Sequence, residues 1–344
     1  MMGQGMRQSN FWTNKIICGD AASVLQRLPA ESVDTVITSP PYYQQRQYKG
    51  ERNSGGIGNE DYVSIYIIAL LDVFDEIHRV VKPSGNIVFN LGDKYIGSSL
   101  ALIPYHFAIS VKNKFRDIQL VNDITWLKKN PTPRQYARRL VSSTESFFHF
   151  AKTPNYYYDR KAFLQNKEKV RNKPTRLLGK SYRGLIDRSK LTVFQKRLAH
   201  KKLDDVIEEV RQDRITGFRM KIKGIHSPAF GGQEGGRKSQ MDRNGFTIIK
   251  INGDGMKKDA IVMAVESEPN IDHPAMFPPK LVGELIKLLT PPKGMVLDPF
   301  VGSGSTALAA IREGRNYCGI DICKEYCDMA LTRIENEYRR QAVS

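Results

Sequence analysis

Short apolar runs that predict strands alternate with helical patterns at both ends of this chain. The predicted strands are Lys15–Cys18, Val33–Thr38, Asn86–Leu91, Asp123–Leu127, Ser146–Phe150, Met295–Leu297 and Tyr317–Asp321. The predicted helices cover residues 22–26, 62–80, 103–112, 307–313 and 324–338. Such alternation is typical of an α/β fold, a mainly parallel sheet with helices on both faces. We expect the strands that begin at residues 123 and 146 to lie at the sheet edge.

The composition changes between residues 155 and 271, where the chain becomes basic and in places rich in glycine. From Arg160 to Lys223 there are 20 lysines and arginines against 7 acidic residues, an excess of 13 in a chain of net charge +17. Surface charge that serves only solubility would mix the signs more evenly. We therefore predict a basic module at 155–271, inserted between two parts of one domain at 11–154 and 272–340, and a polyanionic partner. Its predicted elements are helical segments between 191 and 210 and a strand at Phe246–Ile251.

Several classes of protein are not indicated by the sequence. No stretch approaches the roughly 18 uninterrupted apolar residues of a membrane span, and Met1–Asn10 is polar, unlike a signal peptide. The cysteines match no common zinc spacing, and the histidines show no paired ligand spacing. The cysteines are Cys18, Cys318, Cys323 and Cys327. We expect a cytoplasmic protein of a reducing compartment, without membrane association and without a metal.

A glycine-rich turn between a strand and a helix predicts a nucleotide-binding site near the end of the chain. The strand Met295–Leu297 leads into Asp298-Pro299-Phe300-Val301-Gly302-Ser303-Gly304-Ser305-Thr306, and a helix rich in small residues follows. Glycines in such a turn allow the backbone to approach a ligand closely. Asp321 ends the next strand, 23 residues after Asp298, about where an acidic residue reaches ribose hydroxyls in such units.

Different nucleotides fit this turn to different degrees. A P-loop requires a lysine before its serine or threonine, and Gly304-Ser305-Thr306 has none, so ATP hydrolysis is not indicated. A dinucleotide site prefers a third glycine, and an aspartate at the start of the turn would repel a pyrophosphate. A ligand with an amino group suits that aspartate. S-adenosylmethionine offers an ammonium, a sulfonium and a ribose.

The segment Thr38-Ser39-Pro40-Pro41-Tyr42 directly follows an apolar predicted strand. Two prolines remove two backbone N–H donors and fix two φ angles, so the nearby carbonyl groups are rigid and lack regular partners. An aromatic ring comes next. The combination suits a planar group that donates hydrogen bonds from its edge and stacks through its face, as a nucleobase does. Taken alone, the segment is also compatible with an ordinary turn that ends a strand.

Together these motifs resemble those of the β-class DNA amino-methyltransferases, most closely the branch that modifies cytosine N4. Thr38–Tyr42 resembles the catalytic motif of that family, and Asp298–Thr306 resembles its cofactor motif. The other matching blocks are Gly19-Asp20, Asn90-Leu91-Gly92-Asp93, Trp126-Leu127-Lys128-Lys129-Asn130-Pro131 and His273-Pro274-Ala275-Met276-Phe277-Pro278. The order, with the catalytic motif first and the cofactor motif last, implies a circularly permuted S-adenosylmethionine-dependent methyltransferase fold.

The resemblance implies a role for each matching position. The catalytic residues would be Ser39, Pro40, Pro41 and Tyr42. The residues that bind S-adenosylmethionine would be Asp20, His273, Phe277, Asp298, Phe300, Gly302, Ser303, Gly304, Ser305, Thr306 and Asp321. In this set Asp298 and the glycines would hold the methionine part, Asp321 the ribose and Asp20 the adenine edge, while residues 273–277 would close the pocket.

The basic module would be the target-recognition region, and double-stranded DNA would be its partner. The basic residues expected to contact DNA are Arg183, Arg188, Lys190, Lys196, Arg197, Lys201, Lys202, Arg237 and Lys238. The resemblance also places the protein in a restriction-modification system, near the nucleoid of a bacterium or an archaeon. It allows a cognate restriction endonuclease and a homodimer as further partners.

The implied reaction is methyl transfer to an exocyclic amine of a base that is flipped out of the duplex. This amine is a poor nucleophile because its lone pair is delocalised into the ring, and acceptors on its two N–H bonds would favour a more reactive nitrogen. We expect the Ser39 hydroxyl and the Pro40 carbonyl to be these acceptors, and Tyr42 to stack on the base. Much of the catalysis would then be positioning, without a covalent enzyme–base intermediate.

Three other functions are compatible with the sequence. Serine at position 39 indicates cytosine N4, since the family usually has aspartate or asparagine there when the target is adenine N6, and adenine is the nearest alternative. A related Pro-Pro-Tyr motif occurs in enzymes that methylate protein glutamine or RNA, but the permuted order and the basic insert argue against them. A catalytically inactive DNA-binding protein is the alternative from another class.

Overall fold

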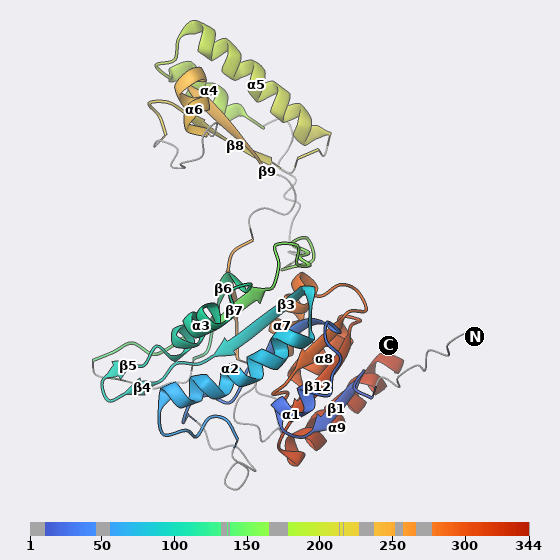
Figure 1. Cartoon of the computed structure of the whole chain (residues 1–344). Helices are drawn as coiled ribbons and strands as arrows, with labels where there is room; N and C mark the ends of the chain where they lie inside the picture. The colour runs from blue at the N-terminus through green and yellow to red at the C-terminus, as the bar shows by residue number, and fades with distance from the viewer. Residues whose placement is uncertain are drawn as a thin grey trace, which may run out of the picture. The chain divides into compact units, whose positions relative to one another are not determined.

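The computed structural model describes residues 11–45, 56–131, 136, 138–164, 178–212, 214–215, 217–226, 237–251, 257–265 and 277–343. The chain forms two compact units, each of which is described by itself. Unit 1 combines Met1–Phe163 with Lys258–Ser344, and unit 2 is Leu164–Lys257. In Figure 1 the blue-to-green and the orange-to-red parts of the chain build unit 1 together.

Unit 1 is built on an eight-stranded sheet in the order β1-β12-β11-β2-β3-β7-β6-β10. The strands are β1 (Lys15–Cys18), β2 (Val33–Thr38), β3 (Val81–Leu91), β6 (Gln119–Lys128), β7 (Thr144–Ala151), β10 (Ala260–Met263), β11 (Met295–Asp298) and β12 (Asn316–Asp321). All strands from β1 to β3 in this order pair in parallel, and β7 is antiparallel to both of its neighbours. Strands from the two ends of the chain interleave, because β2 pairs with β11 and β1 pairs with β12.

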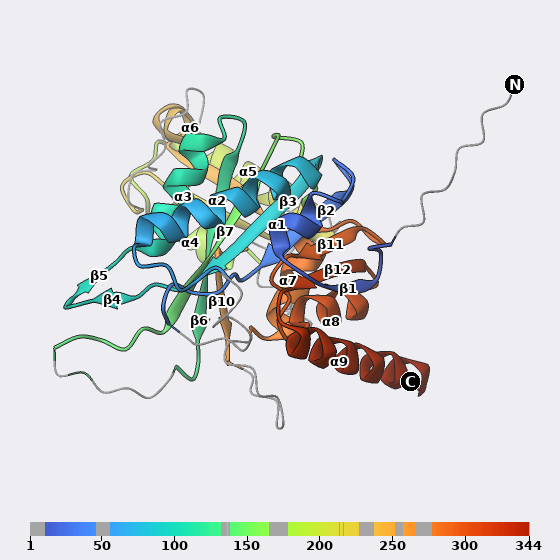
Figure 2. The ribbon, with the colours of Figure 1, turned by 60° about the horizontal axis from the view of Figure 1, so that its bottom comes forward.

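Helices cover both faces of this sheet. The first set is α1 (Ala21–Leu25), α2 (Val63–Val80) and α3 (Ile103–Lys114), and the second is α7 (Pro279–Leu289), α8 (Ser305–Arg312) and α9 (Lys324–Val343). The two sets lie on opposite faces (Figure 2). Under the first set, Phe74, Phe89, Phe107 and Phe150 form an aromatic cluster at the centre of the core. The predicted α/β fold is confirmed.

Two elements of unit 1 differ from the sequence prediction. The expected sheet edge at 123–127 and 146–150 is wrong, because β10 pairs with β6 and forms the edge itself. β10 has only four residues, of which only Ile261 is buried, so its apolar pattern is weak. The helix α7 was not predicted, although buried leucines and isoleucines line it. The strand β4 (Tyr95–Ile96) pairs with β5 (Ser99–Leu100) in a small hairpin that was also not predicted.

The segments on both sides of unit 2 belong to unit 1, although the predicted basic module included them. The Tyr157 amide donates to the Ser84 carbonyl, and the Asp159 amide donates to the Leu288 carbonyl. On the other side, β10 extends the main sheet. Unit 2 is therefore shorter at both ends than the predicted module at 155–271.

Unit 2 has its own small core. It contains α4 (Lys180–Arg188), α5 (Val193–Arg211), β8 (Gly217–Ile222), α6 (Arg237–Asn244) and β9 (Phe246–Ile251). The predicted strand at Phe246–Ile251 is confirmed and pairs in antiparallel fashion with β8. Thr192 and Gln195 form a capping box that fixes the start of α5. The core side chains include Leu203, Ile207 and Phe246.

No helix in the described part of the chain is both long enough and apolar enough to cross a bilayer.

Candidate functional site

The carboxyl ends of the parallel strands β2, β3, β11 and β12 lie at the same edge of the sheet. In the register of β2 and β11, Val36 lies opposite Leu297, so the next residues of both strands run side by side. The Thr38 hydroxyl donates a 2.6 Å hydrogen bond to Asp298 Oδ1, across 260 positions of sequence. The predicted catalytic motif and the predicted cofactor motif therefore start side by side, at the ends of β2 and β11.

Asp298 is a buried carboxylate, 2% exposed, that braces three elements. Besides Thr38, the Thr306 hydroxyl donates to Oδ2 at 2.6 Å and the Phe300 amide donates to Oδ1 at 3.1 Å. Burial, and to a smaller extent the charge of Asp321, raises the pKa of Asp298 to about 6, while the three hydrogen bonds act in the opposite direction. A cation beside this group would favour its charged form, and an anion would disfavour it.

The turn after Asp298 depends on glycine at two positions. Gly302 has φ 50° and Gly304 has φ 87°, both in the left-handed region that favours glycine. A Cβ on Gly304 would also lie 3.0 Å from the Ala330 Cβ on α9. The turn therefore packs closely on α9 and leaves no space for a larger residue at position 304.

Serines on both sides of Gly304 differ in their partners. Arg333 on α9 donates from Nη1 to the Ser303 carbonyl at 2.6 Å and to the Ser303 hydroxyl at 3.1 Å. Ser305, the first residue of α8, is buried, and its hydroxyl has no hydrogen-bond partner within the described part of the chain. A buried hydroxyl without a partner at the start of a helix is a group that a polar ligand can satisfy.

Two further acidic groups lie beside the turn. Asp321 accepts hydrogen bonds from the Gly302 amide at Oδ2 and from the Cys323 amide at Oδ1, both at 2.9 Å, and burial raises its pKa. Asp20 caps the first turn of α1, and the preceding Gly19 donates its amide to the Asp321 carbonyl at 2.9 Å. Because a carboxylate oxygen accepts two hydrogen bonds, each Asp321 oxygen has capacity for one more.

Three predicted cofactor residues remain: two are phenylalanines that pack in unit 1, and the third lies outside the described residues. Phe300 is partly buried against the core of unit 1. Phe277 is buried and packs edge-on against Phe147 of β7, with ring centroids 6.3 Å apart. His273 lies outside the described residues.

The Ser-Pro-Pro-Tyr turn is held by α2 and by the end of β3. Tyr66 of α2 donates a 2.8 Å hydrogen bond to the Pro41 carbonyl. The Tyr42 ring is 7% exposed and lies against Gly92, where a Cβ would come within 2.4 Å of the ring. Glycine at position 92 therefore lets the Tyr42 ring approach the backbone closely.

A polar cluster joins this turn to the antiparallel part of the sheet. Ser39 Oγ lies 3.4 Å from both Tyr42 Oη and Asn90 Oδ1. Tyr42 Oη lies 2.7 Å from Asn90 Oδ1 and 3.2 Å from Glu145 Oε2. Glu145 forms an ion pair with Lys128. A chain of contacts thus runs from Ser39 to Asn90 of β3 and, through Tyr42, to Glu145 of β7 and Lys128 of β6.

Four residues of this site had no predicted role. Asn90 and Lys128 belong to blocks that match the methyltransferase family, so their positions were marked without a function. Glu145 and Arg333 carried no signal, because one lies in an ordinary strand and the other in an amphipathic helix. Only the pairing of distant strands and helices brings them to the turns.

The predicted DNA-contacting residues of unit 2 fall into two groups. Several have partners within the unit: Arg183 pairs with Asp204, Lys202 with Asp205 at 3.4 Å, and Lys196 and Arg188 bond to backbone carbonyls. The others are exposed, with no partner among the described residues: Lys190, Arg197, Lys201 and Lys238. Arg237 is the first residue of α6, and its side chain lies outside the description.

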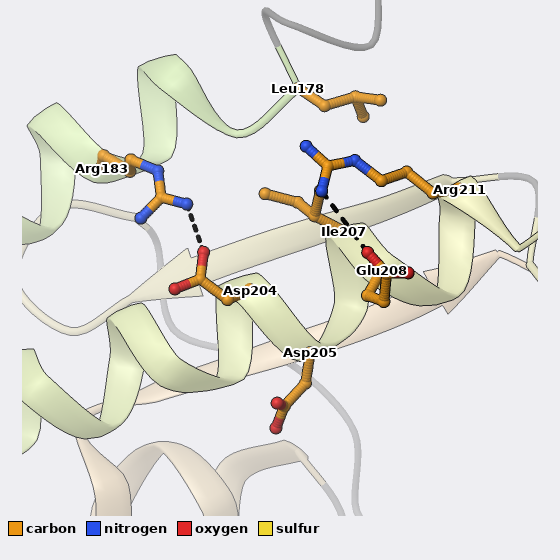
Figure 3. Close-up of a pocket in the computed structure, with 7 residues that line it drawn as sticks. All are labelled: Leu178, Arg183, Asp204, Asp205, Ile207, Glu208 and Arg211. Carbon is orange, nitrogen blue, oxygen red and sulfur yellow. Dashed lines mark hydrogen bonds and ion pairs between the residues drawn. The ribbon is translucent and has the colours of Figure 1, made fainter.

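A hollow of about 470 Å³ lies on the acidic side of unit 2 (Figure 3). It is lined by Leu178, Arg183, Asp204, Asp205, Ile207, Glu208 and Arg211. Both arginines face carboxylates, with Arg211 paired to Glu208 at 3.4 Å. The three acidic groups here would repel phosphate, so the lining of this hollow does not favour a DNA backbone, and the DNA contact of Arg183 stays a prediction.

No group of three or more potential metal ligands occurs among the described residues.

Comparison with known proteins identifies one family over most of the chain. The family model for N6/N4 methyltransferases, described as DNA methylase, matches residues 33–332. The type II methyltransferase M.SmaI of Serratia marcescens is 28% identical, over 95% of this chain and 92% of its own length.

Solved structures with the same fold are also DNA methyltransferases. The cytosine-N4-specific PvuII DNA methyltransferase superposes with a TM-score of 0.55 at 17% identity, covering 94% of this chain and 91% of its own. The M1.HpyAVI–SAM complex superposes with a TM-score of 0.50 at 19% identity, covering 93% and 98%. The fold of unit 1 is thus the S-adenosylmethionine-dependent methyltransferase fold, as predicted.

Replacing Gly92 by alanine is expected to destabilise unit 1 by about 1–3 kcal/mol, because the new Cβ forces the buried Tyr42 ring to move. Urea unfolding followed by tryptophan fluorescence measures this effect, since both tryptophans, Trp12 and Trp126, belong to unit 1. In a Tyr42→Ala background the same substitution is expected to cost much less. An equal cost in both backgrounds would contradict the contact.

The raised pKa of Asp298 predicts a pH-dependent stability difference between the wild type and Asp298→Asn. The folded-state pKa of about 6 lies above the ordinary 3.8, so the folded state holds the proton more tightly. The contribution of this proton to the free energy of unfolding is complete below pH 3.8 and is lost as the pH rises through 6. The wild type should therefore lose about 3 kcal/mol relative to the variant between pH 3.8 and 7. The same urea experiment at several pH values tests this, and a constant difference would refute it.

Proposed function

This chain belongs to the N6/N4 DNA methylase family, and we propose that it methylates the exocyclic N4 of a flipped cytosine in duplex DNA, with S-adenosylmethionine as methyl donor. The observation that carries the proposal is the hydrogen bond from Thr38 to Asp298. It sets the Ser-Pro-Pro-Tyr turn beside the glycine turn, so a base and a methyl donor held by the two turns would be neighbours.

The residues around the glycine turn fit S-adenosylmethionine. When bound, it supplies an activated methyl group on a sulfonium. Asp298 offers a buried negative charge that suits a cationic ligand, and Ser305 offers a buried hydroxyl that lacks a partner in the described chain. Asp321 retains acceptor capacity for ribose hydroxyls, and Asp20 lies at the end of the neighbouring strand. The M1.HpyAVI structure, which has this fold, is a complex with the same compound.

On the DNA side, the Ser39 hydroxyl and the Pro40 carbonyl would accept hydrogen bonds from the two N–H groups of the target amine. The Tyr66 hydroxyl holds the turn in place by donating a hydrogen bond to the Pro41 carbonyl. The Pro40 carbonyl and the Ser39 hydroxyl therefore keep a defined orientation. Positioning of this kind lowers a barrier without any covalent bond between enzyme and base. Tyr42 is the predicted stacking partner of the base, and 7% of this residue is exposed.

Cytosine N4 is favoured over adenine N6 by the serine at position 39. The PvuII DNA methyltransferase, which has the same fold, is cytosine-N4-specific. The type II relatives support a role in a restriction-modification system. Adenine N6 methylation would use the same two turns, and the product analysis below distinguishes it.

The first half of α5 is the surface of unit 2 that best fits DNA. Phe194, Arg197 and Lys201 lie at i, i+3 and i+7, so they share one face of the helix. Phe194 is 75% exposed, and both cations are exposed and unpaired among the described residues. The second half of α5 carries Asp204 and Glu208 and would repel the phosphate backbone.

Ser39→Ala is expected to reduce methyl transfer on the order of 100-fold, the usual cost of losing one group that exchanges a proton or hydrogen bond with the reacting atom. Tritium transfer from S-adenosylmethionine to DNA measures the rate, and mass spectrometry of the hydrolysed DNA identifies the methylated base. Ser32→Ala, which removes a serine hydroxyl bonded to the Pro29 carbonyl far from the turn, is the control. Wild-type activity in Ser39→Ala would overturn the catalytic assignment, and N6-methyladenine as product would overturn the choice of cytosine.

The double variant Arg197→Ala, Lys201→Ala is expected to weaken DNA binding and to reduce the slope of log K against log salt by about 2, since each lost phosphate contact changes it by roughly 0.9. Fluorescence anisotropy at several salt concentrations gives both quantities. The matched control is Arg183→Ala, Arg211→Ala, which removes the same charge from cations paired with acids. Equal slopes for the two double variants would contradict the assignment to α5.

A further inference from the structure

A chain of polar groups leads from Ser39 into the sheet and ends at a carboxylate. Ser39 Oγ lies 3.4 Å from Tyr42 Oη, which lies 3.2 Å from Glu145 Oε2. Glu145 Oε1 forms an ion pair with Lys128 Nζ. In the pairing of β6 and β7, Glu145 lies opposite Trp126, two residues before Lys128. The register of β6 and β7 therefore brings Glu145 and Lys128 together next to Tyr42.

The hydrogen-bond partners of Asn90 determine the direction in which this chain donates. Asn90 Nδ2 donates to the Ser146 carbonyl at 3.2 Å, so Oδ1 faces Ser39 and Tyr42, at 3.4 Å and 2.7 Å. An amide oxygen and a carboxylate only accept hydrogen bonds. Within this cluster the hydroxyls of Ser39 and Tyr42 are therefore the donors, toward Asn90 Oδ1, toward each other and toward Glu145. A Ser39 hydroxyl that donates within the cluster keeps its lone pairs for a donor on the substrate.

The carboxylate at the end of the chain is enclosed and held. The Glu145 side chain is 16% exposed and that of Lys128 is 20% exposed, and Lys128 Nζ also lies 5.0 Å from the Trp126 ring centroid. The carboxylate accepts a hydrogen bond from the Tyr42 hydroxyl, and Tyr42 in turn lies within hydrogen-bond distance of the Ser39 hydroxyl.

We propose that Glu145 is a positioning residue that orients Ser39 as an acceptor and takes up the proton released by the target amine. This role rests on the proposed methyl transfer to an exocyclic amine. Methyl transfer would form the new N–C bond, break the sulfur–methyl bond of S-adenosylmethionine with the electron pair staying on sulfur, and leave one excess proton on the nitrogen. That proton passes to Ser39 Oγ, the Ser39 proton to Tyr42 Oη and the Tyr42 proton to Glu145 Oε2. Glu145 then releases it to solvent, and no other reactant is needed.

Two substitutions of Glu145 separate charge from shape. Glu145→Gln keeps the length of the side chain and removes its charge, whereas Glu145→Asp keeps the charge and shortens the side chain. We expect the single-turnover rate of methyl transfer at saturating DNA to fall on the order of 100-fold in the Gln variant and to recover at least about 10-fold of this in the Asp variant. Affinities for S-adenosylmethionine and DNA should stay within about 2-fold of the wild type, so the loss appears in kcat and not in KM. A purely structural role predicts the opposite order, with Gln better tolerated than Asp.

Glu284→Gln provides a matched control. Glu284 pairs with Lys287 on α7, with side chains 14% and 24% exposed, so a similarly enclosed ion pair is lost away from the turn. This variant should retain the wild-type rate. An equal loss in Glu284→Gln and Glu145→Gln would overturn the proposal, because the effect would then come from general destabilisation.

Tyr42→Phe tests the connection between Ser39 and Glu145. If the proton passes through the Tyr42 hydroxyl, Tyr42→Phe and Glu145→Gln interrupt the same path, and the double variant is no slower than the slower single variant. Rate losses that multiply in the double variant would overturn the relay. A wild-type protein that does not methylate DNA would refute the proposed function itself, whereas an active wild type with an equally active Glu145→Gln variant would refute only the role of Glu145.

Discussion

The hydrogen bond between Thr38 and Asp298 is the contact on which the rest of the site depends. It is short and buried, and it joins the ends of two adjacent parallel strands that come from opposite ends of the chain. A buried carboxylate is costly unless donors surround it, and here hydroxyls from Thr38 and Thr306 and an amide of the turn supply them. The requirement to satisfy this one charge therefore fixes the start of the Ser-Pro-Pro-Tyr turn, the glycine turn and the helix α8 relative to one another.

The electrostatics of the glycine turn follow from that arrangement. Asp298 is buried and Asp321 partly buried, and burial raises the pKa of both, while the charge of Asp321 adds to the rise at Asp298. A ligand with positive charge would stabilise the charged form of these carboxylates, whereas a phosphate would destabilise it. The same turn geometry that binds pyrophosphates in other folds is thus directed toward a cationic ligand by a single acidic residue at its start. This agrees with a sulfonium compound better than with a nucleoside diphosphate or triphosphate.

Sequence predicted those parts of the fold whose signals are local. Apolar runs ending in Gly, Asp or Pro marked β1, β2, β11 and β12, and the residues of both turns were therefore located correctly in the structure. β10 was missed because four residues with one buried side chain carry little periodicity. Glu145 was missed for a different reason: its place beside Tyr42 results from the antiparallel register of β6, β7 and β3, which no local pattern encodes. The roles assigned to the site residues remain predictions, because they concern ligands rather than folding.

The charge of unit 2 illustrates why composition alone overstates a binding surface. The excess of basic residues in the sequence counts Arg183 and Lys202, but both are paired with aspartates of α5 in the folded unit. A cation that is already paired releases fewer counterions on binding DNA, since its partner must be desolvated or displaced. Of the four predicted cations without such partners in the described chain, Arg197 and Lys201 lie on the first half of α5, on the same face as the exposed Phe194. The acidic second half of α5 would then limit the orientations in which DNA can approach. The two halves of the helix thus differ in charge, which the net charge of the unit does not show.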